Sequence, residues 1–138
     1  MPDTVRRVDY YYTIVSDKPG EAARLLTALQ QAKVNLLGFS GFPAGARRSQ
    51  LDFIPENPAT FARAAKALRL KLSKKKTGFL LQGEDRPGIV AQVAHRLGQA
   101  GINVTAVDAV CAGAGRYGAL LWVKSPDLRR AARLLAAS

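Results

Sequence analysis

The stretch Asp17-Lys18-Pro19-Gly20 recurs as Asp85-Arg86-Pro87-Gly88, 68 positions further along a chain of 138 residues. The same shift aligns further identical residues without a gap. These pairs are Leu29 with Leu97, Gln31 with Gln99, Ala32 with Ala100, Asn35 with Asn103, Arg48 with Arg116, and Pro58 with Pro126. Self-similarity at a fixed period indicates a repeated structural unit. The sequence therefore predicts two copies of one unit, over residues 1–73 and 74–138, joined near Ser73.

The order of elements within each copy follows from hydrophobic periodicity. In the first copy, residues 8–15 are β-branched and aromatic, which predicts a strand. Helices are expected at about residues 19–32 and 58–69, each with a proline in its first turn. The second copy repeats this order, with strands expected at residues 102–107 and 117–123 around a glycine-rich turn and a helix from Pro126.

A strand, a helix, two strands and a helix make up most of the split βαβ pattern. The predicted fold class is α+β: two ferredoxin-like βαββαβ units in tandem, with antiparallel sheets and the helices on one face. The fourth strand is short or missing, because residues 70–72 alone follow the last helix of the first copy and the second copy stops at Ser138. Such a gap leaves a sheet edge free for pairing.

Composition and charge exclude several classes of protein. No apolar run approaches the roughly 20 residues of a membrane helix, and the first residues lack the apolar segment of a secretory signal. Cys111 is the single cysteine, so no intramolecular disulfide can form and a cytoplasmic location is expected. The net charge of +11 would attract polyanions non-specifically, which keeps an RNA-binding ferredoxin-like protein as the alternative function.

The sequence contains no recognisable catalytic or metal site. His95 lies off the apolar stripe of its helix, which predicts a surface histidine, and Cys111 is expected to be a small buried apolar residue. The rings of Tyr10, Tyr11 and Tyr12 should alternate between the two faces of a strand, which favours packing over a base-stacking platform. We therefore predict that the protein is not an enzyme and has no cofactor.

The two Asp-x-Pro-Gly motifs, together with Val34-Asn35-Leu36 and Gly101-Ile102-Asn103-Val104, resemble the ACT domain, a family of small regulatory modules that mostly bind amino acids. The resemblance covers nearly the whole chain. It implies a non-catalytic amino-acid-sensing module whose ligand lies near the strand-to-helix loop, at a domain or subunit interface. It also implies a homodimer and a regulated partner protein.

The residues that the resemblance assigns to ligand binding lie in the loops and just after the first helices. They are Asp17, Gly20 and Asn35 in the first copy, and Asp85, Arg86, Pro87, Gly88, Ile89 and Asn103 in the second. A helix N-terminus offers free N–H groups to a carboxylate, glycine permits close approach, and an ionised aspartate suits an ammonium group. We expect Asp85 to bind the ammonium, and Asn103 with the N–H groups of Gly88 and Ile89 to bind the carboxylate.

Lys33 stands where the family has a glycine and where the second copy has Gly101. A lysine in a left-handed helix cap costs about 1 kcal/mol. This difference predicts that the first copy is shaped differently or is purely structural, and that the second copy binds ligand more tightly.

An oligomer is expected from the strand patterns. Residues 13–15 and 79–81 are largely apolar at successive positions, which places apolar side chains on both faces of a sheet. Since helices cover only one face, the other should be buried against a second unit or chain. We expect no specific nucleic acid and no membrane among the partners.

Overall fold

The computed structural model describes residues 1–138 and divides them into two compact units. The first unit is Asp9–Lys76, and the second combines Met1–Val8 with Thr77–Ser138. The sequence predicts that the copies meet near Ser73, with all residues before it in one unit. In the structure the first eight residues lie with the second repeat.

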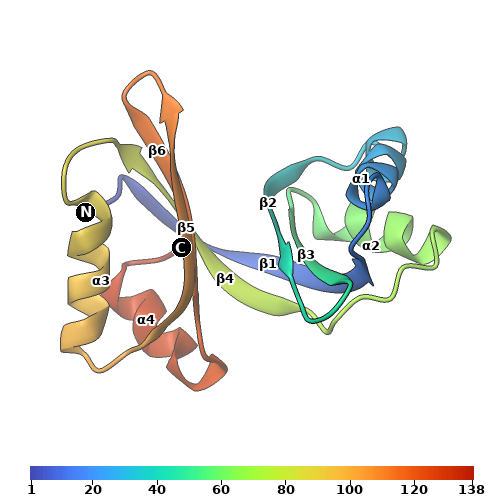
Figure 1. The fold of residues 1–138 in the computed structure, drawn as a ribbon. Helices are drawn as coiled ribbons and strands as arrows, with labels where there is room; N and C mark the ends of the chain where they lie inside the picture. The colour runs from blue at the N-terminus through green and yellow to red at the C-terminus, as the bar shows by residue number, and fades with distance from the viewer. The chain divides into compact units, whose positions relative to one another are not determined.

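The first unit is a three-stranded antiparallel sheet with two helices. Its elements are the second part of β1 (Thr4–Ser16), α1 (Glu21–Gln31), β2 (Leu36–Pro43), β3 (Arg48–Pro55) and α2 (Pro58–Ala67), with strands in the order β2-β3-β1. Figure 1 shows α1 and α2 on the same side of these strands. Phe53 of β3 and Phe61 of α2 are fully buried in the core of this unit, and the ring of Tyr11 stacks on Phe61 with 5.4 Å between the ring centroids.

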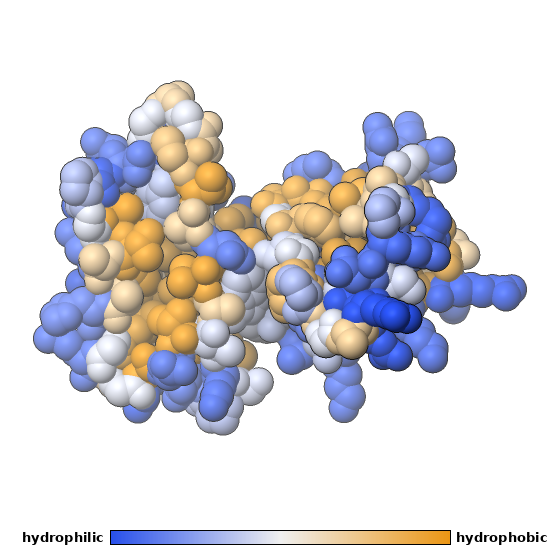
Figure 2. All heavy atoms as spheres, viewed as in Figure 1, coloured by the Kyte–Doolittle hydropathy of each residue, from blue (hydrophilic) through white to orange (hydrophobic).

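The second unit repeats the arrangement. Its elements are β4 (Lys76–Glu84), α3 (Ile89–Gln99), β5 (Val104–Gly113), β6 (Arg116–Val123), a short 3-10 helix η1 (Ser125–Asp127) and α4 (Leu128–Leu134), with strands in the order β4-β6-β5. Figure 1 shows α3 and α4 on one side of this sheet, and Figure 2 shows apolar residues gathered between them and the strands. The registers match the internal repeat, because Thr13 pairs with Leu51 and Leu81 with Ala119. The predicted α+β fold with two units of the split βαβ type is confirmed.

The fourth strand differs between the units. In the first unit, residues 71–73 lie beside β1, where the N–H of Ser73 donates to the carbonyl of Tyr12 at 2.8 Å. In the second unit, residues 4–8 of β1 take this place beside β4. The chain end then joins them, since Val5 accepts a hydrogen bond from the N–H of Ser138 at 3.0 Å. Residues 4–8 of β1 thus hold beside β4 the place that residues 71–73 hold beside β1 in the first unit.

Burial in the strands departs from one expectation. Phe79, Leu80 and Leu81 are all buried in the single chain, at 5% exposure or less, so β4 presents no apolar face that an oligomer must cover. The exposed large apolar side chains lie elsewhere, among them Ile14 on β1 and Val107 and Val110 on β5. Both outer strands carry exposed apolar side chains: Phe39 and Phe42 on β2, and Val107 and Val110 on β5.

The helices are short and amphipathic. None of α1 to α4 is both long and apolar enough to cross a membrane.

Candidate functional site

The strand-to-helix loops that carry the repeated motif have the same backbone conformation in both units. Gly20 and Gly88 are the N-cap residues of α1 and α3, with φ of 87° and 84°. This left-handed conformation is strained for any residue with a side chain, which explains the glycine at both positions. The N–H of Asp17 donates to the carbonyl of Arg47 at 2.9 Å, and the N–H of Asp85 to that of Gly115 at 2.8 Å. Each loop is therefore held by a hairpin turn of its own unit. The β2–β3 turn holds the first loop, and the β5–β6 turn holds the second.

The aspartates do not serve as helix caps. Neither α1 nor α3 has a side-chain hydrogen bond at its N-cap, and Asp17 and Asp85 are both exposed. Helix N-termini leave N–H groups without intrahelical partners, and a glycine cap cannot satisfy them. Both loops thus combine an accessible carboxylate with an uncapped helix terminus.

Two of the residues assigned from the second motif are used by the protein itself. The N–H of Ile89 donates to the carbonyl of Arg86 at 3.3 Å, and its side chain is buried in the core. The guanidinium of Arg86 reaches Gln92 at 3.4 Å. The expectation that the N–H of Ile89 is free for a ligand is therefore wrong, because the turn at Pro87 and Gly88 closes onto it.

The structure does not bring the asparagines to these loops. Asn103 follows the C-terminal end of α3, and Gly88 precedes its N-terminal end. A helix of 11 residues is about 16 Å long. The ammonium and carboxylate of an amino acid share one carbon atom, so Asp85 and Asn103 of one repeat cannot hold both ends of it. Our expectation of that arrangement is wrong, and α1 separates Gly20 from Asn35 in the same way.

The two asparagines also differ in their surroundings. The side-chain amide of Asn35 donates to Glu56 at 3.0 Å, beside a small cavity of about 200 Å³ near the start of α2. Asn103 is exposed, and Lys124 stands at the position equivalent to Glu56. The second repeat therefore cannot form the hydrogen bond that orients Asn35.

The turn after the first helix has nearly the same conformation in both repeats, in spite of the lysine. Lys33 has a φ of 60° and Gly101 a φ of 73°. The expectation of a differently shaped turn is wrong, because the surrounding structure holds Lys33 in the left-handed region. The similar turns therefore give no reason to expect that the second repeat binds a ligand more tightly than the first.

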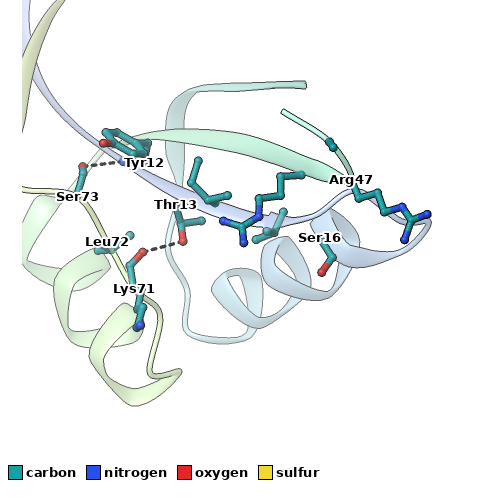
Figure 3. A pocket seen from close by; sticks show the side chains of 11 residues that line it. Tyr12, Thr13, Ser16, Arg47, Lys71, Leu72 and Ser73 are labelled. Carbon is teal, nitrogen blue, oxygen red and sulfur yellow. Dashed lines mark hydrogen bonds between the residues drawn. The ribbon is translucent and has the colours of Figure 1, made fainter. Parts of the chain in front are cut away.

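The first unit contains a cavity beside β1. A pocket of about 630 Å³ runs along the end of β1, within the roughly 300–1,000 Å³ usual for ligand sites. It is bounded by residues 12–16 of β1, 46–48 of the hairpin and 71–73 after α2. Figure 3 shows Thr13 donating its hydroxyl to the carbonyl of Lys71, at 2.7 Å, and Ser73 hydrogen bonded to the backbone of Tyr12. Beyond these two hydrogen bonds the chain turns away toward α2.

The equivalent space in the second unit is filled. Gly83 corresponds to Val15, and a Cβ atom at Gly83 would lie 3.0 Å from the backbone nitrogen of Asp3 and 3.1 Å from the ring of Tyr117. Tyr117, which replaces Ser49 of the first repeat, is only 4% exposed. The carboxylate of Asp3 forms an ion pair with Arg116 at 2.6 Å, and the ammonium of Met1 donates to Gln92. The ring of Tyr117 thus fills space beside Gly83, while Asp3 lies at the repeat position of Lys71.

Burial raises the pKa of the Tyr117 phenol, and the nearby carboxylate of Asp3 raises it further. The Tyr117 hydroxyl has no hydrogen-bond partner. In the first loop, a hydrogen bond from Arg24 lowers the pKa of Glu21 at the start of α1. Periodicity gave no signal for the pocket or for Tyr117, although the serine-to-tyrosine difference between aligned copies was visible.

The structure also places His95 and Cys111. His95 is exposed on α3, as predicted. Cys111 is also exposed, so the expectation of a buried residue is wrong: it lies on β5, a strand at the edge of the sheet. No group of three or more histidine, cysteine, aspartate or glutamate side chains could hold a metal ion.

Comparison with solved structures identifies the fold. The chain is similar to protein BT0572 from Bacteroides thetaiotaomicron, with a TM-score of 0.82 and 14% identity over 96% of this chain and 88% of that one. It is also similar to the regulatory subunit of aspartate kinase from Thermus thermophilus, with a TM-score of 0.66 and 14% identity over 98% and 96% of the two chains. The subunit from Thermus flavus gives a TM-score of 0.61 and 15% identity over the same shares.

No protein-family model matches the sequence, and no curated protein matches it. The structural likeness nevertheless extends over almost the entire chain, including both repeats. The chain therefore has a tandem ACT-like fold.

Proposed function

We propose that this protein is a non-catalytic, cytoplasmic regulatory module that senses a small molecule, which we expect to be an amino acid. The observation that carries the proposal is the pair of uncapped helix N-termini, each beside an exposed aspartate, in a tandem ACT-like fold. The helix terminus suits the carboxylate of an amino acid, and Asp17 or Asp85 suits its ammonium group. The regulatory subunits of aspartate kinase that share the fold support a regulatory role and a regulated partner protein.

The geometry refines the assignment of the site. Asp17 and Gly20 in one unit, and Asp85 to Gly88 in the other, remain the proposed contacts to the ammonium and carboxylate groups. Asn35 and Asn103 lie at the far ends of α1 and α3, so they would contact a ligand held by a different loop, such as one from a second copy of the chain. A homodimer is therefore part of the proposal.

A thermal-shift screen of the twenty amino acids tests the ligand class. The amino acid that raises the melting temperature is then titrated by calorimetry into the parent protein, Asp85→Ala and Asp17→Ala. A charge-assisted hydrogen bond contributes roughly 1.5–3 kcal/mol, so each change should weaken binding about ten- to a hundredfold at its own loop. If neither change alters binding, the loops are not the site. If no amino acid shifts the melting temperature, the ligand class is wrong.

The state of assembly can be measured independently. Val107 and Val110 are 44% and 68% exposed on β5, an edge strand of 10 residues whose free edge can pair with another chain. Light scattering at micromolar concentration should therefore give a mass above the 14.8 kDa of one chain. Val110→Lys should reduce that mass, because a charged residue on an edge strand opposes pairing. A clean monomer of the parent protein would contradict the expected dimer.

A further inference from the structure

The pocket beside β1 is lined by three cationic side chains and by no acidic one. Arg47 lies in the β2–β3 turn, Arg48 begins β3, and Lys71 follows α2. All three residues are exposed, and none of them takes part in an ion pair. Figure 3 shows Arg47 and Lys71 on opposite sides of the pocket. A cavity with this charge and no counter-ion of its own attracts small anions from solution.

The second unit neutralises the corresponding charge within the chain. Arg116 is equivalent to Arg48 in the internal repeat, and it forms an ion pair with Asp3 at 2.6 Å. Asp3 lies at the repeat position of Lys71. The first unit therefore has a second cation where the second unit has the carboxylate that pairs with its arginine. Because the like charges of Arg48 and Lys71 repel each other, an anion bound between them would stabilise both.

Arg47 is held in a backbone conformation that glycine adopts more easily. Its φ is 59°, and the equivalent residue of the second unit is Gly115, with a φ of 70°. A side chain in this left-handed region carries a conformational cost that glycine avoids. The carbonyl of Arg47 accepts a hydrogen bond from the N–H of Asp17 at 2.9 Å, which fixes the turn against the end of β1. Strained residues of this kind gather at binding sites, so Arg47 adds to the evidence for a ligand here.

The rest of the lining offers apolar surface and one available hydroxyl. The side chains of Val15 and Leu72 border the cavity, whose volume of about 630 Å³ exceeds what a lone anionic group needs. Thr13 and Ser73 donate their hydroxyl protons to backbone carbonyls. The hydroxyl of Ser16, also in the lining, remains available as a donor to a ligand. The pocket therefore has room for an anionic group joined to an organic part.

We propose that this pocket binds a small phosphorylated molecule, with its phosphate held among Arg47, Arg48 and Lys71 and its organic part against Val15 and Leu72. A phosphate monoester carries about −1.5 to −2 charges near pH 7 and has three strong acceptor oxygens. It therefore matches three cations better than a single carboxylate, which Arg116 alone binds in the second unit. This site is separate from the amino-acid contacts at the helix N-termini and does not depend on them.

The test uses the full chain and three probes that share one ring: phenyl phosphate, benzoate and phenol. Titration followed by amide NMR should shift the signals of Ser16 and Arg48 with phenyl phosphate. Benzoate and phenol should bind at least about tenfold more weakly, because they lack the doubly charged group. Arg48→Ala should weaken the binding of phenyl phosphate about three- to tenfold, and rising salt should weaken it as well.

Lys71→Asp introduces the residue that the second unit has at this position. The new carboxylate should pair with Arg48, as Asp3 pairs with Arg116, and weaken the binding of phenyl phosphate by more than about tenfold. The backbone carbonyl of residue 71 still accepts the hydroxyl of Thr13, so the fold should persist. Circular dichroism checks that each variant is folded.

Arg63→Ala is the matched control, because it removes an exposed cation of the same unit that does not line the pocket. It should leave the binding of phenyl phosphate unchanged. The proposal is overturned if the signals of Ser16 and Arg48 do not move, or if benzoate binds as tightly as phenyl phosphate. It is also overturned if Arg63→Ala weakens binding as much as Arg48→Ala, because the net charge alone would then account for the affinity.

Discussion

The two units share a backbone register and loop geometry, yet they complete their sheets in different ways. In the first unit residues 71–73 lie beside β1 without forming a strand, and they line a pocket there. The second unit borrows residues 4–8 from the start of the chain, and Tyr117 and Asp3 close the corresponding space. The two copies therefore keep the same order of strands and helices and the same loop conformations. A few substitutions and the origin of one strand decide whether a site is open or filled.

The largest expected effect tests whether the N-terminal strand belongs to the second unit. Val5 is 7% exposed in the core of the second unit, so Val5→Asp places an uncompensated charge there. We expect a loss of about 3–5 kcal/mol in the free energy of unfolding. Hydrogen exchange should show reduced protection in residues 77–138 before residues 9–76. Thr4→Asp, at an exposed neighbouring position, should change stability little. Lost protection confined to the first unit would contradict the assignment.

The close packing around Gly83 in the second unit can be tested by introducing valine, the residue at the equivalent position of the first unit. Gly83→Val introduces the side chain found at Val15, and its Cβ would meet the backbone of Asp3 at 3.0 Å. Overpacking of this kind costs about 1–3 kcal/mol, because the chain must move to admit the new atoms. Urea denaturation measures the change. Gly98→Ala is the control, since a Cβ there has open space and alanine favours a helix. A neutral Gly83→Val would show that the N-terminus is loosely held.

A reciprocal exchange tests the turns after α1 and α3. Lys33 and Gly101 both have positive φ, so Lys33→Gly should stabilise the protein and Gly101→Lys should destabilise it, each by about 1 kcal/mol. Midpoints of chemical denaturation report both changes. Effects of equal sign would mean that the side chain of Lys33 forms interactions that outweigh its backbone strain.

The smallest expected effect concerns the hydroxyl of Tyr117, which is buried without a partner. Tyr117→Phe removes it and should be neutral or stabilising by up to about 1 kcal/mol. Because the pKa of Tyr117 is raised in the folded state, its contribution to stability is intact below pH 10 and is lost as pH rises above that. Tyr117→Phe should therefore reduce the loss of stability in alkali. Tyr10→Phe is the comparison, since the pKa of Tyr10 is raised as well. An unchanged alkaline profile in Tyr117→Phe would contradict this account.

Local sequence patterns predicted most of the secondary-structure elements and loops. The motif at Asp17 and Asp85 located both strand-to-helix loops, and the glycine-rich stretch near Gly113 located a hairpin with positive φ at three successive residues. These features depend on short-range conformational preferences of glycine and proline, which a sequence displays directly. The proposed site was less accessible to such reasoning, because the helices that separate Gly88 from Asn103 set distances that sequence spacing does not reveal.

The sequence by itself determined that two similar units exist, which elements each contains, and that one edge strand is short or absent after each second helix. Only the tertiary structure decided that residues 4–8 complete the second unit, that Cys111 lies on an exposed edge, and that the first unit has a pocket beside β1. The physical reason is that strand pairing joins residues far apart in the chain, and its partners depend on which edge remains free. Hydrophobic periodicity indicates which secondary structure a segment can form. The sheet edge that remains unpaired determines where that segment binds.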